Sequence, residues 1–361
     1  MANGKLLRQL IKAGASGNTD SFRRVTEEVI RAERQKQHHL LADELEQILH
    51  SRANSPVGAS LHHLASKVPY DRERGLPLLE VHSPRRGFLD VVLTEENLAI
   101  LESILREHHR ADVLSSMGLR PTHRLLFCGP PGCGKTLTAE VIATELSWPL
   151  VVVRIDSVIS SFLGETAANL RQVFDFMQSA PMVVLFDEFD ALAKERSEQG
   201  EHGELKRVVN AVLQMMDAYK GRSIIIAATN HESILDSAIW RRFEEVLLFD
   251  LPTDEQLNKL FALKLRGIRR NFSIGAGQKQ SLETFDSAKL FKDLYPKGGL
   301  SHADVERILQ RAIKQMILCN EERLEIDHLK AALWREKARA QRIHHARRVY
   351  LSNEVEKRSH S

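Results

Sequence analysis

The chain contains no run of eighteen or more apolar residues, so we expect neither a transmembrane helix nor a membrane partner. Its N-terminus lacks a long apolar stretch followed by small residues, so a secretory signal is not expected either. The three cysteines, Cys128, Cys133 and Cys319, form no disulfide framework and no paired C-x-x-C motif. Together these absences favour a reducing, cytoplasmic compartment.

Aromatic residues and net charge are also scarce. Aromatics make up 6% of the chain, and the formal net charge is +3. A charge this small does not by itself predict a nucleic-acid partner, and neither a stacked-aromatic platform nor a zinc module is visible. With 43% hydrophobic and 27% charged residues, the composition is that of an ordinary globular protein, and 361 residues allow two or three domains.

The sequence pattern divides the chain into five segments. Residues 1–50 are typical of three short amphipathic helices, a module too small to bury a large core. Residues 51–86 begin with a Ser-, Asn-, Gly- and Pro-containing stretch and are interpreted as a linker. We expect an α/β subdomain at residues 87–250, a helical lid at 251–340 and a basic C-terminal tail at 341–361.

Short β-branched and aliphatic runs alternate with helical segments through the α/β region. Such runs are typical of strands that are buried on both faces of a parallel sheet. Five strands are expected, at residues 125–127, 150–153, 183–186, 224–226 and 246–249. We therefore predict an α/β fold with a parallel five-stranded sheet, a C-terminal helical lid and a small N-terminal helical domain. The lid helices should begin at Thr253, at Ser301 and near Ile326.

The strongest chemical signal is the octapeptide Gly129-Pro130-Pro131-Gly132-Cys133-Gly134-Lys135-Thr136, followed by Leu137. It matches G-x-x-x-x-G-K-[ST] between an expected strand and an expected helix, a context that argues against a chance Gly-rich turn. Glycines let backbone N–H groups surround phosphate oxygens, and the helix N-terminus adds partial positive charge. Lys135 is expected to reach the β- and γ-phosphates, and the Thr136 hydroxyl to ligate Mg²⁺. ATP and Mg²⁺ are the predicted cofactors.

A second apolar strand ends in two carboxylates, Asp187 and Glu188, about fifty residues after the octapeptide. Asp187 is expected to hold Mg²⁺ through water, and Glu188 to polarise the attacking water. The alternative is a strand end that simply enters solvent, where Asp and Glu are common. A phosphate-binding loop upstream favours the functional interpretation, because charges at the end of a buried strand are costly unless they have a role.

Two further polar positions follow later strands. Asn230 ends the strand that begins at Ile224, and its amide could orient the water or contact the γ-phosphate; a turn-forming Asn is the alternative. Arg241 and Arg242 precede Phe243 and could stabilise transition-state charge on a phosphate bound by a neighbouring subunit. The alternative is a solvated basic turn. Of the two arginines we favour Arg242, because it directly precedes the phenylalanine.

In this order and spacing, these four elements resemble the AAA family of P-loop ATPases, within the AAA+ class, over roughly residues 88–340. The segment from Gly299 to Asp304 is similar to a lid segment of the family, although His302 stands where the family usually has glycine. The resemblance implies that Phe162 and Leu163 form a substrate-gripping pore loop. It also implies a homo-oligomer, a hexamer, in which arginines act across subunit interfaces.

The function that the resemblance implies is an ATP-hydrolysing ring that remodels, unfolds or threads protein substrates. The N-terminal helices are weakly similar to the microtubule-interacting and transport domains of katanin-like proteins, and a partner protein could bind there. One alternative is a regulatory or adaptor ATPase that acts with a separate partner such as a protease. The other alternative is a DNA-directed motor, which is supported only faintly, by the basic tail. A nucleic-acid partner is therefore not expected.

Overall fold

The computed structural model describes residues 25–26, 28–29, 64–159, 163–190, 202–231, 237–266, 289, 299–321, 324–339 and 341–342. The chain forms two compact units, Met1–Ser66 and Lys67–Ser361. The N-terminal module expected at residues 1–50 lies outside the described residues except for four helical positions, and so does most of the expected basic tail. The second unit contains the sheet and the lid.

A six-stranded sheet forms the centre of the second unit, in the order β1-β3-β4-β5-β2-β6. The strands are β1 (Leu79–His82), β2 (Arg124–Cys128), β3 (Leu150–Val153), β4 (Val183–Phe186), β5 (Ile224–Thr229) and β6 (Glu245–Leu248). Strands β3, β4, β5, β2 and β6 pair in parallel. The predicted α/β fold with five parallel strands is therefore confirmed.

The sixth strand, β1, differs from the expectation of a linker over residues 51–86. It pairs antiparallel with β3, from Leu79 opposite Val153 to His82 opposite Leu150. Sequence patterns did not reveal it because it has only four residues, and Glu80 and His82 lie exposed at its outer positions. A short, half-polar strand at a sheet edge carries little of the apolar signal that identifies buried strands.

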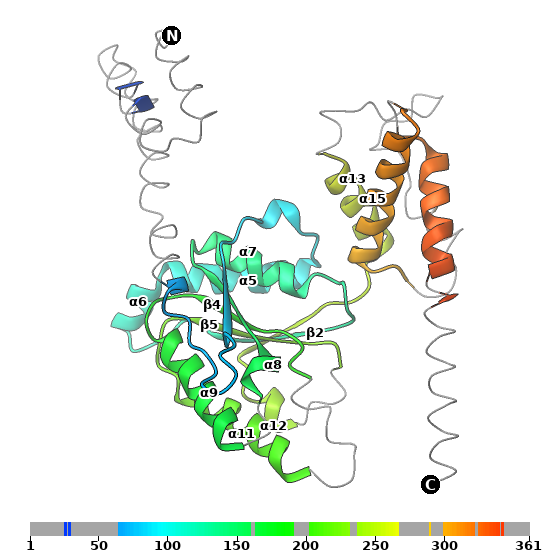
Figure 1. The fold of residues 1–361 in the computed structure, drawn as a ribbon. Coiled ribbons are helices and arrows are strands. Elements are labelled where there is room, and N and C mark those ends of the chain that lie inside the picture. The colour runs from blue at the N-terminus through cyan, green and yellow to red at the C-terminus, as the bar shows by residue number, and fades with distance from the viewer. Residues whose placement is uncertain are drawn as a thin grey trace, which may run out of the picture. The chain divides into compact units, whose positions relative to one another are not determined.

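Helices cover both faces of the sheet (Figure 1). Helices α5 (Glu95–His109) and α7 (Lys135–Glu145) lie on one face, and α9 (Leu163–Met177) and α11 (His202–Ala218) lie on the other. The short helices are η1 (Phe88–Asp90), α6 (Ala111–Ser116), α8 (Ile155–Val158) and α12 (Ser237–Trp240). None of the helices in the described ranges has both the length and the apolar character needed to cross a bilayer.

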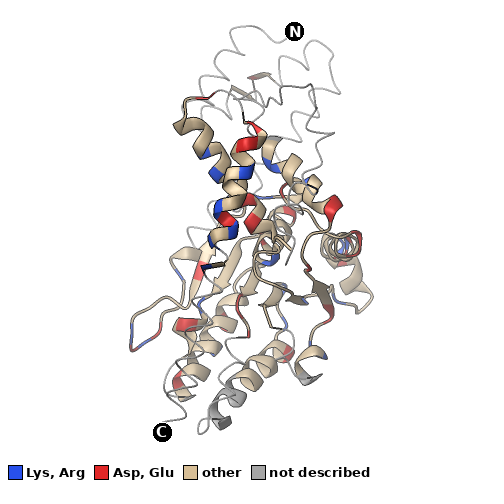
Figure 2. Cartoon of the chain, turned by 90° about the vertical axis from the view of Figure 1, so that its right-hand side faces the viewer, with Lys and Arg blue, Asp and Glu red and all other residues tan. Residues whose placement is uncertain are grey.

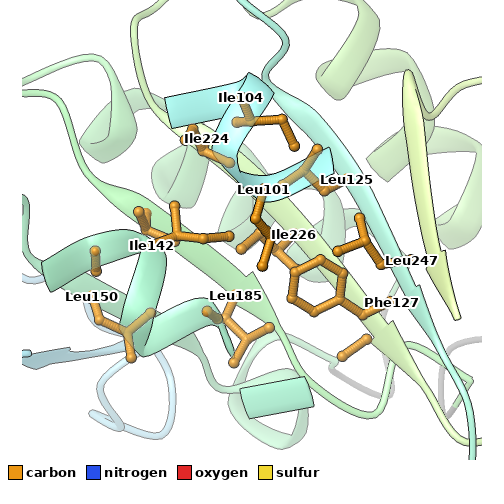
Figure 3. Packing of buried hydrophobic residues seen from close by; sticks show 14 of the residues in the cluster. Leu101, Ile104, Leu125, Phe127, Ile142, Leu150, Leu185, Ile224, Ile226 and Leu247 are labelled. Atoms are coloured by element: carbon orange, nitrogen blue, oxygen red, sulfur yellow. The ribbon is translucent and has the colours of Figure 1, made fainter. Parts of the chain in front are cut away.

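The core between α5, α7 and the sheet consists mainly of aliphatic side chains, together with Phe127, Phe249 and Cys133 (Figure 3). Leu101 and Ile104 of α5 and Ile142 of α7 meet Phe127 of β2 and Leu185 of β4, and all of these residues are buried. Phe127 also contacts Phe249, with ring centroids 5.1 Å apart. This packing fixes the carboxyl ends of the central strands relative to the first turn of α7.

The lid is a separate helical layer with its own core. It contains α13 (Asp254–Arg266), α15 (His302–Leu318) and a helix at residues 326–339. Helices α13 and α15 begin at the predicted caps. Thr253 and Gln256 bond reciprocally at the start of α13, and Ser301 and Asp304 do so at the start of α15.

One buried carboxylate, Glu336, organises the arginines of the lid. Its side chain is only 4% exposed and pairs with Arg307 at 3.2 Å, Arg311 at 2.6 Å and Arg339 at 2.5 Å. These partners come from α15 and from the last helix, so the cluster joins the two elements. Removing one member of a buried ion cluster leaves uncompensated charge, which costs far more than losing an exposed pair.

We predict that Glu336→Ala destabilises the protein by about 1.5–3 kcal/mol, because three partly exposed arginines lose their shared charge-assisted hydrogen bonds. Chemical denaturation, followed by circular dichroism, measures the loss. Glu255→Ala is the matched control, since its pair with Lys259 on α13 is exposed on both sides, and it should cost less than about 1 kcal/mol. Equal effects for the two variants would contradict the assignment of Glu336 as the organising charge.

Candidate functional site

The predicted phosphate-binding loop lies between the end of β2 and the start of α7, as its sequence context required. Gly129 has φ +143°, and a Cβ there would overlap the Phe249 carbonyl oxygen, so no larger residue fits. Gly134 is the N-cap of α7 with φ +101°, a conformation that glycine adopts without strain. The glycines thus allow the backbone to fold back on itself in front of a helix N-terminus, a favourable place for an anion.

Lys135 lies at the centre of this loop and is only 7% exposed. Its Nζ donates to the carbonyl oxygens of Gly129 at 2.6 Å and Pro130 at 3.0 Å, and to Asn230 Oδ1 at 2.9 Å. Burial lowers the pKa of the Lys135 ammonium, and neighbouring acidic groups oppose that shift. The contact with Asn230 brings together two predicted site residues that are far apart in the sequence.

Thr136 and Asp187 meet directly at the same edge of the sheet. The Thr136 hydroxyl donates to Asp187 Oδ2 at 2.9 Å, and Asp187 Oδ1 accepts from the Glu188 amide at 2.9 Å. A hydroxyl and a carboxylate are the hard oxygen ligands that Mg²⁺ prefers. This pair therefore fits the predicted magnesium site.

Glu188 follows β4 in a left-handed backbone conformation, with φ +51°. Such a conformation is unfavourable for a residue other than glycine and is concentrated at functional sites. The Phe189 amide donates to the Ala228 carbonyl at 2.8 Å and holds the turn against β5. The Glu188 side chain is consequently exposed at the pocket while its neighbour Phe189 is buried.

Asp190 is a site residue that the sequence interpretation missed. It is 3% exposed and its Oδ1 accepts from the Thr229 hydroxyl and from the Asn230 amide, both at 3.3 Å. It therefore links the turn after β4 to the end of β5 and positions Asn230. The sequence did contain a signal for it, because Asp190 is the third acidic residue in the four-residue segment 187–190.

The lid completes the pocket above the loop. The Ala303 amide of α15 donates to the Gly132 carbonyl at 3.0 Å. Gly132 has φ +79°, and a Cβ there would approach the Ala303 and Ser301 side chains to 2.9 Å. The lid thus contacts the loop so closely that glycine is required at this position.

The resulting cavity of about 390 Å³ brings most of the predicted residues together. It is lined by the loop from Pro131 to Leu137 and by Asp187, Glu188 and Asn230. It is also lined by Val91, Val92, Leu260, Lys264 and His302. The sequence did not predict that these last residues line a pocket. They come from three segments that meet only in the folded chain.

His302 is unusual within this wall. Both of its ring nitrogens are buried and make no hydrogen bond in the described part of the chain. Burial lowers the pKa of His302, while the Val92 backbone beside the ring opposes that shift. Burial therefore disfavours the charged form of the imidazole at this wall of the cavity.

Cys133 belongs to the loop but carries no reactive character. It is 2% exposed, and burial raises the pKa of its thiol. A thiol that stays protonated is a poor nucleophile and a poor target for oxidation. Its role in the loop is that of a small buried side chain.

The two arginines differ in their surroundings. Arg242 forms an ion pair with Asp217 near the end of α11, whereas Arg241 is exposed. Neither of them lines the 390 Å³ cavity. The sequence-based preference for Arg242 stays a prediction, but Arg242 is held by its own chain and Arg241 has no carboxylate partner among the described residues.

The predicted pore loop falls at the edge of the described chain. Leu163 is the first residue of α9, and Phe162 lies outside the described residues. The gripping role of these two residues stays a prediction.

The site combines a loop lysine, a Thr–Asp pair and an exposed glutamate at the carboxyl ends of parallel strands. This combination defines a P-loop nucleoside triphosphatase. Comparison with known proteins narrows this class. The profile of the AAA family, described as the ATPase family associated with various cellular activities, matches residues 125–251. The chain is also 39% identical over 318 residues to an uncharacterized AAA family ATPase, y4kL, of Sinorhizobium fredii, covering 88% of this chain and 90% of that protein.

Two further relatives match over shorter regions. Protein mac-1 of Caenorhabditis elegans is 37% identical over 201 residues, which span 51% of this chain and 24% of the relative. A protein of Methanocaldococcus jannaschii named as a homologue of a 26S proteasome regulatory subunit, MJ1494, is 35% identical over 187 residues, half of each chain. The chain belongs to the AAA family and is an ATPase.

We predict that Lys135→Ala and Glu188→Gln separate nucleotide binding from hydrolysis. Lys135→Ala should lose ATP binding, because the phosphates lose their central cation. Glu188→Gln should bind ATP and hydrolyse it at least about a hundredfold more slowly, because an amide cannot accept the proton from water. Isothermal titration calorimetry and phosphate release measure the two properties. Micromolar ATP affinity in Lys135→Ala, or near-normal turnover in Glu188→Gln, would contradict these roles.

Proposed function

We propose that the chain is one subunit of a homo-oligomeric ring, a hexamer, that uses ATP hydrolysis to unfold or thread protein substrates. The observation that carries the proposal is the division of the hydrolytic groups. The cavity gathers Lys135, Thr136, Asp187, Glu188 and Asn230, while the paired arginines lie outside it. An ATPase site that lacks its arginine finger is completed when a neighbouring subunit supplies one.

Within one subunit, each residue has a distinct task in hydrolysis. The backbone N–H groups of the loop bind the phosphates, and Lys135 neutralises charge on the β- and γ-phosphates. Glu188 orients the attacking water and accepts its proton, and Asn230, held by Asp190, fixes the water or the γ-phosphate from the side. Thr136 and Asp187 would hold Mg²⁺, which supplies electrostatic stabilisation of the phosphate oxygens when it is bound.

The part of the cavity lined by Val91, Val92 and Leu260 suits the nucleoside. These side chains provide apolar surface for a flat base. This arrangement supports ATP as the nucleotide.

Arg241 is the better candidate for the group supplied to the next subunit. An arginine that must reach a neighbouring phosphate needs a free guanidinium, and Arg241 is exposed while Arg242 is paired with Asp217. Arg242 then acts as a positioning residue that fixes the segment on which Arg241 lies. This assignment reverses the preference drawn from the sequence alone.

A protein substrate is supported by the family and by the pore-loop pattern at Phe162 and Leu163. The name of the Methanocaldococcus jannaschii relative, a homologue of a proteasome regulatory subunit, points in the same direction. A cytoplasmic location is consistent with the cysteine content, since the chain has three cysteines and those described are unpaired.

We predict that Arg241→Ala lowers ATP hydrolysis by about a thousandfold with little change in ATP affinity, the lower end for a lost arginine finger. Arg242→Ala should have a smaller effect, because the segment loses its anchor but keeps the guanidinium that acts on the phosphate. Steady-state hydrolysis and nucleotide titration compare the two variants. The reverse order of effects would make Arg242 the finger.

Mixed assemblies test whether the arginine acts in the neighbouring subunit. Arg241→Ala and Glu188→Gln subunits are each inactive alone. In mixed rings, some interfaces pair an intact arginine with an intact glutamate, so partial activity should return. Inactive rings would count against action between subunits, provided that co-purification through an affinity tag on one of the two variants verifies the mixing.

We predict that Phe162→Ala abolishes substrate unfolding while basal hydrolysis stays within a few-fold of the original, because the phosphate site is untouched. The melting temperature should change little, whereas truncating a buried Phe costs about 3–5 kcal/mol. Unfolding of a fluorescent test protein and thermal denaturation measure the two effects. A stable Phe162→Ala protein with normal unfolding would reject threading and favour a regulatory or adaptor ATPase.

A further inference from the structure

A second cavity of about 960 Å³ lies on the lid, well apart in sequence from the loop and its strands. We name it the lid groove. Its walls include Lys314, Leu318 and Cys319 from the second half of α15 and its C-cap, and Trp334, Arg335 and Arg342 from the last described helical segment. The helices beneath it are joined by the buried lid core and by Glu336. The two helices that carry most of the groove are therefore packed against each other.

The described residues that line the groove carry a net positive charge. Its lining contains no Asp or Glu among the residues that the structure describes. The buried Glu336 pairs with both Arg311 and Arg339, so its single negative charge offsets only part of their positive charge. Lys314, Arg335 and Arg342 are exposed and have no carboxylate partner within the described ranges. Figure 2 shows both Lys and Arg (blue) and Asp and Glu (red) along the helices that face the viewer, and the groove is lined by residues of the first kind.

Large apolar side chains lie beside these cations. Trp334 is 70% exposed and Leu318 is 82% exposed, although both could bury substantial apolar area. Tryptophan is highly buried on average, so an exposed one within a hollow marks a binding site more often than an ordinary surface position. Trp and Arg are also the residue types that contribute most to protein–protein binding energy.

We propose that the lid groove is a docking site for a partner protein, which binds through a segment with an apolar side chain flanked by carboxylates. The carboxylates would pair with Lys314, Arg335 and Arg342, and the apolar side chain would cover Trp334 and Leu318. A single-stranded nucleic acid fits less well, because stacking platforms use several aromatic rings and this groove offers one. A bilayer surface fits less well, because it cannot enter a hollow.

Cys319 provides a reporter for occupancy of the groove. It is exposed, whereas Cys128 and Cys133 are buried, so a maleimide modifies Cys319 selectively in the folded protein. The probe is a short synthetic peptide in which Glu and Leu alternate. It should slow the modification of Cys319 in a saturable manner and less strongly at high salt, since the pairing is electrostatic. A Lys–Leu peptide and a Glu–Ser peptide should give little protection.

Charge reversal identifies the site of binding. Lys314→Glu with Arg335→Glu should weaken protection by the Glu–Leu peptide at least about tenfold, and Trp334→Ala should weaken it by about tenfold. Lys220→Glu with Arg222→Glu, which reverses the same charge on the exposed surface of the α/β region, is the matched control and should change nothing. Basal ATP hydrolysis should be unchanged in all three, because none of these residues lines the nucleotide cavity.

The other outcomes overturn the proposal. Protection by oligothymidylate but not by the Glu–Leu peptide would make the groove a nucleic-acid site, and protection by phosphatidylserine vesicles would make it a membrane site. Protection that grows with protein concentration alone would mean that a second copy of the chain covers it. Absence of protection by the peptide at millimolar concentration, or equal loss in the control pair, would reject docking.

Discussion

The register of three parallel strands, β4, β5 and β2, determines the geometry of the nucleotide site. Phe186 pairs with Ala227, and Cys128 pairs with Thr229, so these strands end side by side. Asp187, Asn230 and Gly129 follow those ends directly, which is why a hydroxyl, a carboxylate, an amide and a lysine meet there. A shift by one residue would turn every apolar side chain of a strand to the opposite face. The buried core and the site are therefore fixed by the same constraint.

The sequence predicted the parts of the site whose signals are local. The loop before α7 and the carboxylates after β4 each adjoin a strand with a continuous apolar run, so motif and context agreed. The lid helices were predictable for a similar reason, because Thr253 and Ser301 are caps that precede amphipathic patterns. β1 had no such signal, since its four residues alternate between buried and exposed positions at the edge of the sheet.

The remaining features depend on distances that only the folded chain defines. His302 and Val92 are separated by more than half of the chain, yet they line one cavity. The pairing of Arg242 with Asp217 likewise cannot be inferred from the two adjacent arginines, which look equivalent in the sequence. Asp190 stands close to two other carboxylates in the sequence. Its role, however, follows from hydrogen bonds with Thr229 and Asn230 at the end of a different strand, β5.

The hydrogen bond from the Ala303 amide to the Gly132 carbonyl connects the first turn of α15 to the phosphate loop. Because α15 is one continuous helix from His302 to Leu318, a tilt at either end is transmitted to the other. Nucleotide binding at the first turn of α15 and ligand binding at its C-terminal half are then linked thermodynamically. Whatever factor nucleotide adds to the affinity of a ligand on α15, that ligand must add to the affinity for nucleotide. Coupling through α15 can therefore be measured as a change in nucleotide affinity or as a change in the affinity for the ligand in the lid groove.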